Sequence, residues 1–211
     1  MSSILLTGFE PFGSWAINPS QIIVNEFAQH PPQADLICRV LPTVYQAAGE
    51  QIRALIAEHR PQIILCLGLS SQRKLICLER FGLNVDDVSQ ADNSSTVRQG
   101  DPINPAGPAA YRSNVKLEPL LASLHENGFA AEISNHAGTY VCNHVFYQAL
   151  RANTESGGAA GTLFVHLPMV REGLTDEAAA QCGWTIADQT RAVKEVLAGL
   201  VQQRRELAAS A

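Results

Sequence analysis

The sequence contains no apolar segment that approaches the roughly 18 residues needed for a membrane-spanning helix. It has no cluster of lysines and arginines, and its formal net charge is −5, which argues against a nucleic-acid partner. Segment 1–7 lacks a basic region, and its apolar run is too short for a signal peptide. We therefore expect no membrane partner and a cytoplasmic location.

Familiar cofactor and metal motifs are also missing. None of the patterns G-x-G-x-x-G, Walker A, H-E-x-x-H or G-x-S-x-G is present, and no two cysteines form a C-x-x-C pair. The five cysteines are odd in number and irregularly spaced, so we expect thiols in a reducing compartment. Three of them, Cys38, Cys66 and Cys77, lie in apolar segments, where a thiol behaves as a small hydrophobic group. We expect neither a metal nor a cofactor.

What is present is a globular composition, with 46% hydrophobic and 17% charged residues among 211. Short apolar segments alternate with segments of helical periodicity. The predicted strands are 3–7, 35–41, 62–68, 75–85, 130–134 and 162–167, and the predicted helices are 20–28, 43–59, 117–127, 143–151 and 175 to about 207. Segments 8–19 and 86–113 are rich in glycine, proline and polar residues, and we expect long loops there.

This alternation predicts an α/β fold in which helices cover both faces of a largely parallel sheet. We expect one domain over residues 1–211, with the last few residues frayed. Ligands of such sheets bind outside the carboxyl ends of the strands. That rule selects the residues that follow Thr7, Gly68, Ser134 and Val165.

Cys142 is the candidate nucleophile. It lies in the segment Gly-Thr-Tyr-Val-Cys-Asn-His (138–144), where a loop leads into a helix. A helix N-terminus stabilises negative charge, and its free N–H groups can hold an oxyanion. The alternative is a buried thiol at the start of a helix.

His166 and Glu79 are candidate partners for that thiol. His166 closes an apolar strand and can act as the base for Cys142, although it can equally be a hydrogen-bonded structural histidine. His144 is two residues from Cys142 and should point elsewhere, whereas His136 remains a competitor. Glu79 lies among apolar neighbours, where a carboxylate needs a partner such as an imidazolium; the alternative partner is Arg80.

Two phenylalanines, Phe9 and Phe12, lie in the glycine- and proline-rich loop that follows the first strand. Two aromatic faces can form a slot for a small, flat, neutral ring. The alternative is that both side chains anchor the loop to the core.

Several motifs occur together and in a fixed order. They are Leu-Leu-Thr-Gly-Phe-Glu-Pro-Phe-Gly (5–13), Asn-Pro-Ser (18–20), Glu-Arg (79–80), Gly-Pro-Ala-Ala-Tyr (107–111), Ala-Gly-Thr-Tyr-Val-Cys-Asn-His (137–144) and Phe-Val-His-Leu-Pro (164–168). In this combination the sequence resembles the pyroglutamyl peptidase I family, also called pyrrolidone-carboxylate peptidases, over most of its length.

The resemblance implies a cysteine exopeptidase with a three-layer α/β/α sandwich around a mixed sheet and no cofactor. Its substrates would be small peptides with an N-terminal pyroglutamyl residue, and many bacterial members are homotetramers. The catalytic groups of the family map onto Glu79, Cys142 and His166. The residues that would bind the substrate ring are Phe9, Phe12, Asn18 and Tyr140, and backbone groups near Leu69 would meet the lactam.

Two departures from the family pattern concern the site. Ser89 replaces an arginine that many bacterial members carry, and Leu69 stands where many have glutamine. Loss of an oxyanion donor can cost about 2.7–4 kcal/mol, so we expect lower activity or a shifted substrate preference. Two alternatives follow, a weakly active or non-catalytic pyroglutamyl-binding protein and another thiol amidohydrolase on the same scaffold. The physiological substrates and the oligomeric state are not determined by the sequence.

Overall fold

A central sheet organises the computed structural model, which describes residues 3–210. Seven strands of this part of the chain form the sheet in the order β2-β1-β3-β9-β4-β7, and β8 pairs with β4. The strands are β1 (Ile4–Phe9), β2 (Leu36–Leu41), β3 (Ile63–Leu69), β4 (Ile76–Leu83), β7 (Ala110–Arg112), β8 (Ala131–His136) and β9 (Gly161–Leu167). Strands β2, β1, β3 and β9 are parallel, whereas β4 runs antiparallel to β9 and parallel to β8.

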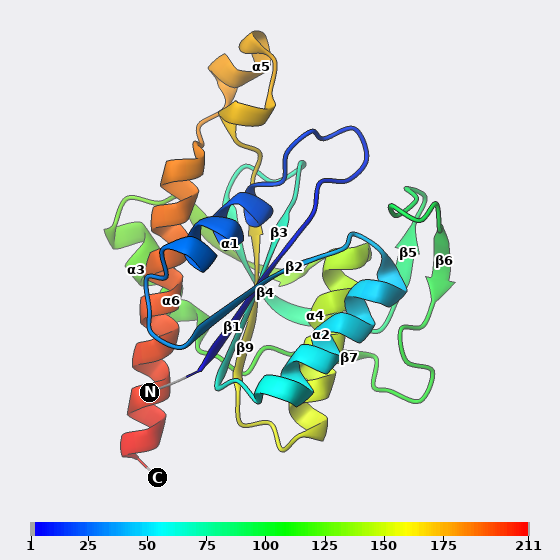
Figure 1. Cartoon of the computed structure of the whole chain (residues 1–211), viewed down its shortest axis with the longest axis vertical. Coiled ribbons are helices and arrows are strands. Elements are labelled where there is room, and N and C mark those ends of the chain that lie inside the picture. The colour runs from blue at the N-terminus through cyan, green and yellow to red at the C-terminus, as the bar shows by residue number, and fades with distance from the viewer. Residues whose placement is uncertain (1–2, 211) are drawn as a thin grey trace.

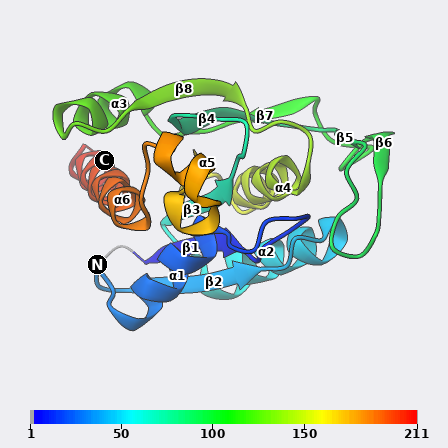
Figure 2. The ribbon, with the colours of Figure 1, turned by 90° about the horizontal axis from the view of Figure 1, so that it is seen from above.

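Helices cover both faces of this sheet. Helices α1 (Pro19–Gln29), α3 (Leu117–Glu126) and α6 (Ile186–Ala209) lie on one face, and α2 (Tyr45–His59) and α4 (Val141–Glu155) lie on the other (Figures 1 and 2). The predicted three-layer α/β/α fold with a largely parallel, mixed sheet is therefore confirmed.

The core explains why the strands could be recognised in the sequence. Strands β1 and β3 are buried at every position and β9 at all but its first, because each is covered on both faces. Continuous apolar segments are typical of such strands. Helix α4 is buried at each of its first ten residues, since it lies between the sheet and α2.

Two predicted segments differ from the structure. The predicted helix 175–207 is divided into α5 (Asp176–Gln181) and α6, because residues 182–185 are extended and Thr185 caps α6 in a capping box. The predicted loop 86–113 contains β7 and the hairpin β5 (Asp86–Val88) and β6 (Arg98–Asp101). The hairpin projects beside α2 (Figures 1 and 2).

The chain end and the helix lengths give two further results. Helix α6 continues to Ala209, beyond the predicted end near 207, and residue 211 lies outside the described residues. Between residues 3 and 210, none of the helices combines the length and the apolar character that crossing a membrane requires.

Candidate active site

Glu79 and His166 meet on neighbouring strands. The antiparallel pairing of β4 with β9 sets Cys77 opposite His166 and Glu79 opposite Phe164. This register lets Nδ1 of His166 donate a hydrogen bond of 2.8 Å to Oε1 of Glu79. Both side chains are buried, and Glu79 has no exposed surface. The carboxylate therefore fixes the orientation of the ring and leaves Nε2 free for another partner.

Cys142 supplies that partner. It is the second residue of α4, and Gly138, with a φ of 75°, lies in the turn from β8 into this helix. The Cys142 side chain lines the same cleft as His166 and is one of the groups that raise the pKa of that ring. The geometry thus brings together all three predicted catalytic residues, which come from β4, α4 and β9. The sulfur also lies at a helix N-terminus, where negative charge is favoured.

The surroundings of His166 favour its charged form. Burial by itself disfavours the charged ring, but the hydrogen bonds and negative charges of Cys142 and Glu79 outweigh it and raise the pKa of His166 from 6.5 to about 9. A protonated ring beside the sulfur is the counter-ion that a thiolate nucleophile requires.

Gly68 sets how closely the sulfur approaches the sheet. A Cβ atom at this position would lie 2.8 Å from Sγ of Cys142 and 2.8 Å from the ring of Phe164. Both distances are shorter than real Cβ contacts allow, so only glycine fits. Sequence reasoning used Gly68 as a strand end and missed this role, although a glycine that closes an otherwise apolar strand was a signal for close approach.

A cleft of about 470 Å³ opens beside Cys142 and His166. Its walls come from the first loop, the turn after β3, the segment after β5 and the turn before α4. The other lining residues are Phe12, Leu69, Ser70, Ser71, Gln72, Arg73, Val88, Gln90, His136, Ala137, Gly138, Thr139 and Tyr140. Sequence reasoning did not single out Gln72, Arg73 or Gln90, because isolated polar residues in loops carry no pattern.

Phe12 and Tyr140 form an aromatic wall of this cleft. Their ring centroids are 5.7 Å apart, and the Tyr140 ring also packs edge-on against Tyr45 at 5.5 Å. The Tyr140 hydroxyl donates a hydrogen bond of 2.9 Å to the carbonyl of Ala91. This bond ties the turn before α4 to the segment after β5. Leu69, at the end of β3, lines the cleft as well.

Phe9 and Asn18 lie behind the cleft and are not among its lining residues. Phe9 is 1% exposed and packs against Phe164, as in the alternative that the sequence left open. Asn18 is also buried; its Oδ1 accepts from the N–H of Ser20 at the start of α1, and its Nδ2 donates to the carbonyl of Glu10. Both residues thus shape the first loop.

The competing partners occupy other positions. Nδ1 of His144 donates a hydrogen bond of 2.8 Å to Oδ2 of Asp86, so the His144 ring points away from the thiol. His136 lines the cleft, and its Nδ1 accepts a hydrogen bond from the N–H of Gly138. The guanidinium of Arg80 faces Glu118 at 3.9 Å rather than Glu79. Ser89 lies between two cleft residues, Val88 and Gln90, but is not a lining residue itself.

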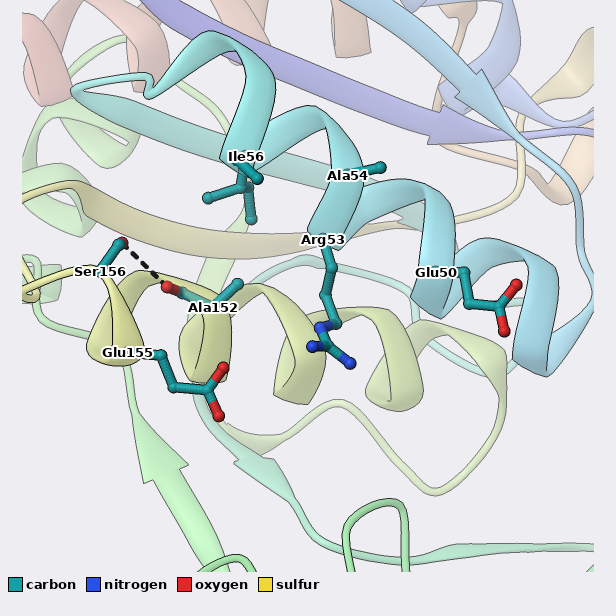
Figure 3. A pocket seen from close by; sticks show the side chains of 8 residues that line it. Glu50, Arg53, Ala54, Ile56, Ala152, Glu155 and Ser156 are labelled. Carbon is teal, nitrogen blue, oxygen red and sulfur yellow. Dashed lines mark hydrogen bonds between the residues drawn. The ribbon is translucent and has the colours of Figure 1, made fainter.

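A second cavity, of about 480 Å³, lies on the surface between α2 and α4 (Figure 3). Its lining residues include Glu50, Arg53, Ala152 and Glu155, and it contains neither a cysteine nor a histidine. Of these two cavities, the cleft beside β3 and β9 is the one that a thiol lines. Within residues 3–210, no three His, Cys, Asp or Glu side chains are grouped so that they could hold a metal ion.

Comparison with known proteins identifies the family of the chain. A family model described as pyroglutamyl peptidase matches residues 2–203. A pyrrolidone-carboxylate peptidase of Streptococcus pyogenes serotype M4 is 33% identical over 198 residues, which cover 94% of this chain and 92% of the relative. One of Bacillus licheniformis is 35% identical over 176 residues, 82% of this chain and 81% of the relative.

A solved structure of similar fold carries the same name as these relatives. The crystal structure of pyrrolidone carboxyl peptidase from Pyrococcus furiosus superposes with a TM-score of 0.89 at 31% identity, and covers 96% of this chain and 99% of that chain. The family model matches nearly the whole length of the chain, and the relatives agree with that match. These findings show that the chain belongs to the pyroglutamyl peptidase family.

Proposed function

We propose that Cys142, His166 and Glu79 are the catalytic groups with which this chain removes the N-terminal pyroglutamyl residue of peptides. The family and the relatives identify the chain as a pyroglutamyl peptidase, a cysteine omega peptidase. One observation carries the assignment of the residues. A buried carboxylate orients an imidazole, and that imidazole lines the same cleft as a thiol at a helix N-terminus.

The mechanism follows from this arrangement. The Cys142 thiolate attacks the carbonyl carbon of the pyroglutamyl peptide bond, and the free N–H groups at the start of α4 hold the resulting oxyanion. The imidazolium of His166 then gives its proton to the leaving amine as the C–N bond breaks, which leaves a thioester. The neutral ring next takes a proton from a water molecule, and this water hydrolyses the thioester and regenerates the thiolate. Glu79 keeps the ring in position throughout.

Recognition of the substrate ring requires an apolar slot and a few hydrogen bonds, because pyroglutamate is a neutral five-membered lactam. Phe12 and Tyr140 supply the aromatic wall of this slot. The pairing of β1 with β3 ends at Thr7 and Cys66. The backbone N–H and C=O of Leu69 therefore have no partner on β1 and supply polar groups to the slot. Phe9 and Asn18 support the slot from behind.

Several broader expectations belong to the same proposal. The substrates are small peptides with an N-terminal pyroglutamyl group, and the enzyme works in the cytoplasm as a homo-oligomer, a tetramer by resemblance. It needs no cofactor, and residues 1–211 act as one domain. Neither a nucleic acid nor a membrane is among its partners. The arrangement of the Glu79, His166 and Cys142 side chains favours catalysis over a binding function alone.

Cleavage of pyroglutamyl-naphthylamide by the wild type and by Cys142→Ser tests the nucleophile. We expect turnover by the wild type and a loss of at least about 10³-fold in kcat for the serine variant. Equal rates would exclude Cys142. A panel of blocked and free N-terminal dipeptides tests the other amidohydrolase function, because only a pyroglutamyl peptidase prefers the lactam.

A further inference from the structure

We propose that segment 91–93, in the loop between β5 and β6, determines which ring size the cleft accepts, because it holds both side chains of the aromatic wall in place. The inference rests on the proposed function and deepens it, since it assigns the contacts that select a five-membered lactam. Neither Ala91 nor Asn93 is among the described lining residues, so both act as positioning residues through Phe12 and Tyr140.

One contact of this segment is with the first loop. Nδ2 of Asn93 donates hydrogen bonds of 2.9 Å to the carbonyl of Pro11 and of 2.9 Å to Oε1 of Glu10. Pro11 directly precedes Phe12. Asn18 and Thr43 also hold this loop, but the carbonyl that they bind is that of Glu10. The position of the Phe12 ring therefore depends most directly on Asn93.

A second contact is with the turn before α4. The hydroxyl of Tyr140 donates a hydrogen bond of 2.9 Å to the carbonyl of Ala91, two residues before Asn93. The rings of Phe12 and Tyr140 also touch each other, with centroids 5.7 Å apart. The same short segment thus fixes both rings, although they come from parts of the chain that are far apart in sequence.

The segment is itself anchored to the start of α2. The N–H of Asn93 donates to the carbonyl of Thr43 at 2.9 Å. The buried carboxylate of Asp92 accepts from the N–H of Tyr45, the first residue of α2, at 3.0 Å. The N–H of Thr43 donates in turn to Oε1 of Glu10, which closes the network. The aromatic wall is therefore held by a helix and cannot move freely.

A wall that cannot move discriminates between rings of different size. A six-membered lactam has the same N–H and C=O edge as a five-membered one, so the backbone of Leu69 can meet that edge in both. The larger ring differs by one methylene group, which must fit against Phe12 and Tyr140. A well-packed apolar surface accepts an extra methylene only with strain. The wall thus selects ring size, and the end of β3 selects the lactam.

Protection of Cys142 from alkylation measures this selection without any need for turnover. Iodoacetamide labels Cys142 of the whole chain, and mass spectrometry of its peptide gives the rate in the presence of 2-pyrrolidone or 2-piperidone, the five- and six-membered lactams. We expect 2-pyrrolidone to protect the wild type at about tenfold lower concentration or less, because one methylene in an apolar pocket changes binding by about 10- to 200-fold.

Asn93→Ala removes the contact with the first loop. Its preference for 2-pyrrolidone should fall about threefold or more, and KM for pyroglutamyl-naphthylamide should rise by a similar factor, as is usual for the loss of a hydrogen bond. Its kcat should stay near the wild-type value, because Cys142 and His166 are not touched. Asn93→Asp has the same size but lacks the N–H donor, so it should show the same loss.

Two further variants complete the test. Tyr140→Phe retains the ring but loses the bond to Ala91, so its preference for 2-pyrrolidone should fall as well. Gln99→Ala is the matched control, because Gln99 is an exposed residue of the neighbouring strand β6. It should keep the wild-type preference. Thermal unfolding of each variant reports its effect on the fold.

The proposal would be overturned by an unchanged preference in Asn93→Ala, by a wild-type preference in Asn93→Asp, by an equal loss in Gln99→Ala, or by no preference in the wild type. A lower unfolding temperature of Asn93→Ala with an unchanged preference would mean that Asn93 only stabilises the fold. Failure of the proposed function is separate, because it would be seen as absent turnover of pyroglutamyl-naphthylamide by the wild type.

Discussion

Gly68 shows how a residue without a side chain can control a nucleophile. The absence of a Cβ lets Sγ of Cys142 lie against β3 and beside Phe164. The position of the sulfur relative to His166 therefore depends on three elements rather than on α4 alone. Small changes at this point should alter catalysis more than they alter the fold.

We predict that Gly68→Ala lowers kcat at least tenfold, because the new methyl group would lie 2.8 Å from Sγ of Cys142 and must displace the sulfur from its place beside His166. Steady-state cleavage of pyroglutamyl-naphthylamide measures the effect. Gly183→Ala is the matched control, since a Cβ there meets no atom within 4 Å. Unchanged kcat in Gly68→Ala would show that the close contact has no role in positioning the thiol.

Glu79 is expected to control the pH range of activity. It is one of the groups that raise the pKa of His166 to about 9, so the wild type should lose activity as pH rises through about 9 and the imidazolium loses its proton. Glu79→Gln removes the negative charge, which should lower kcat and shift this basic limb to lower pH. The profile of kcat/KM between pH 6 and 10 measures both, and an unshifted limb would contradict the assigned role.

At the scale of elements, α1 and the first loop form one unit. Asn18 caps α1 through Ser20 and holds the carbonyl of Glu10, and the N–H of Phe9 donates to the hydroxyl of Ser20. The loop that carries Phe12 into the cleft is therefore anchored by the start of a helix. Substrate affinity should depend on this cap although Asn18 does not touch the cleft.

We expect Asn18→Ala to lower the free energy of unfolding by about 1–2 kcal/mol, the usual cost of losing an N-cap. It should also raise KM more than it lowers kcat, because it releases Phe12 and leaves the Cys142–His166 pair in place. Urea unfolding and steady-state kinetics measure the two effects. Asn18→Asp retains the capping oxygen and should recover part of the stability; if it matched Asn18→Ala, the cap would not be the cause.

The elements themselves differ in how well the sequence predicts them. Strands covered on both faces, such as β3, give continuous apolar segments and were found within one or two residues. The strand β6 was missed because Arg98–Asp101 is polar and largely exposed, so it shows no alternation. The break between α5 and α6 was missed because residues 182–185 contain no proline, and Gly183 alone is a weak signal.

The site was predicted in part. Each of Glu79, Cys142 and His166 has a local signal, but only the register of β4 against β9 shows that the first and last are neighbours. Phe9 and Phe12 look alike in the sequence, yet Phe9 is still within β1 and faces the core whereas Phe12 is beyond the strand. The place of Gln90 in the cleft could not be predicted, because it depends on the fold of segment 86–113, which local sequence patterns do not determine.

At the scale of the whole molecule, the buried pair at the site links stability to pH. The pKa of His166 is raised from 6.5 to about 9 in the folded protein, so between these values the folded state holds a proton that the unfolded state releases. The stability that this proton contributes is fully present below about pH 6.5 and is lost as pH rises through 9.

We therefore expect the free energy of unfolding to fall between pH 6.5 and 9, and to fall less steeply in His166→Asn. Urea unfolding at several pH values within this window gives both slopes, and the difference between them isolates His166 from the other titrating groups. Parallel slopes for the two proteins would contradict the raised pKa.

The register of β4 against β9 limits where the sequence can accept insertions and deletions. Successive residues of a strand point to opposite faces of its sheet, so a shift of one position along β9 would turn Glu79 away and bring Arg80 toward the imidazole. The shift would replace attraction by repulsion between two cations. An insertion or deletion of one residue between Ile76 and Glu79 would therefore reverse the sign of the charge that the histidine meets.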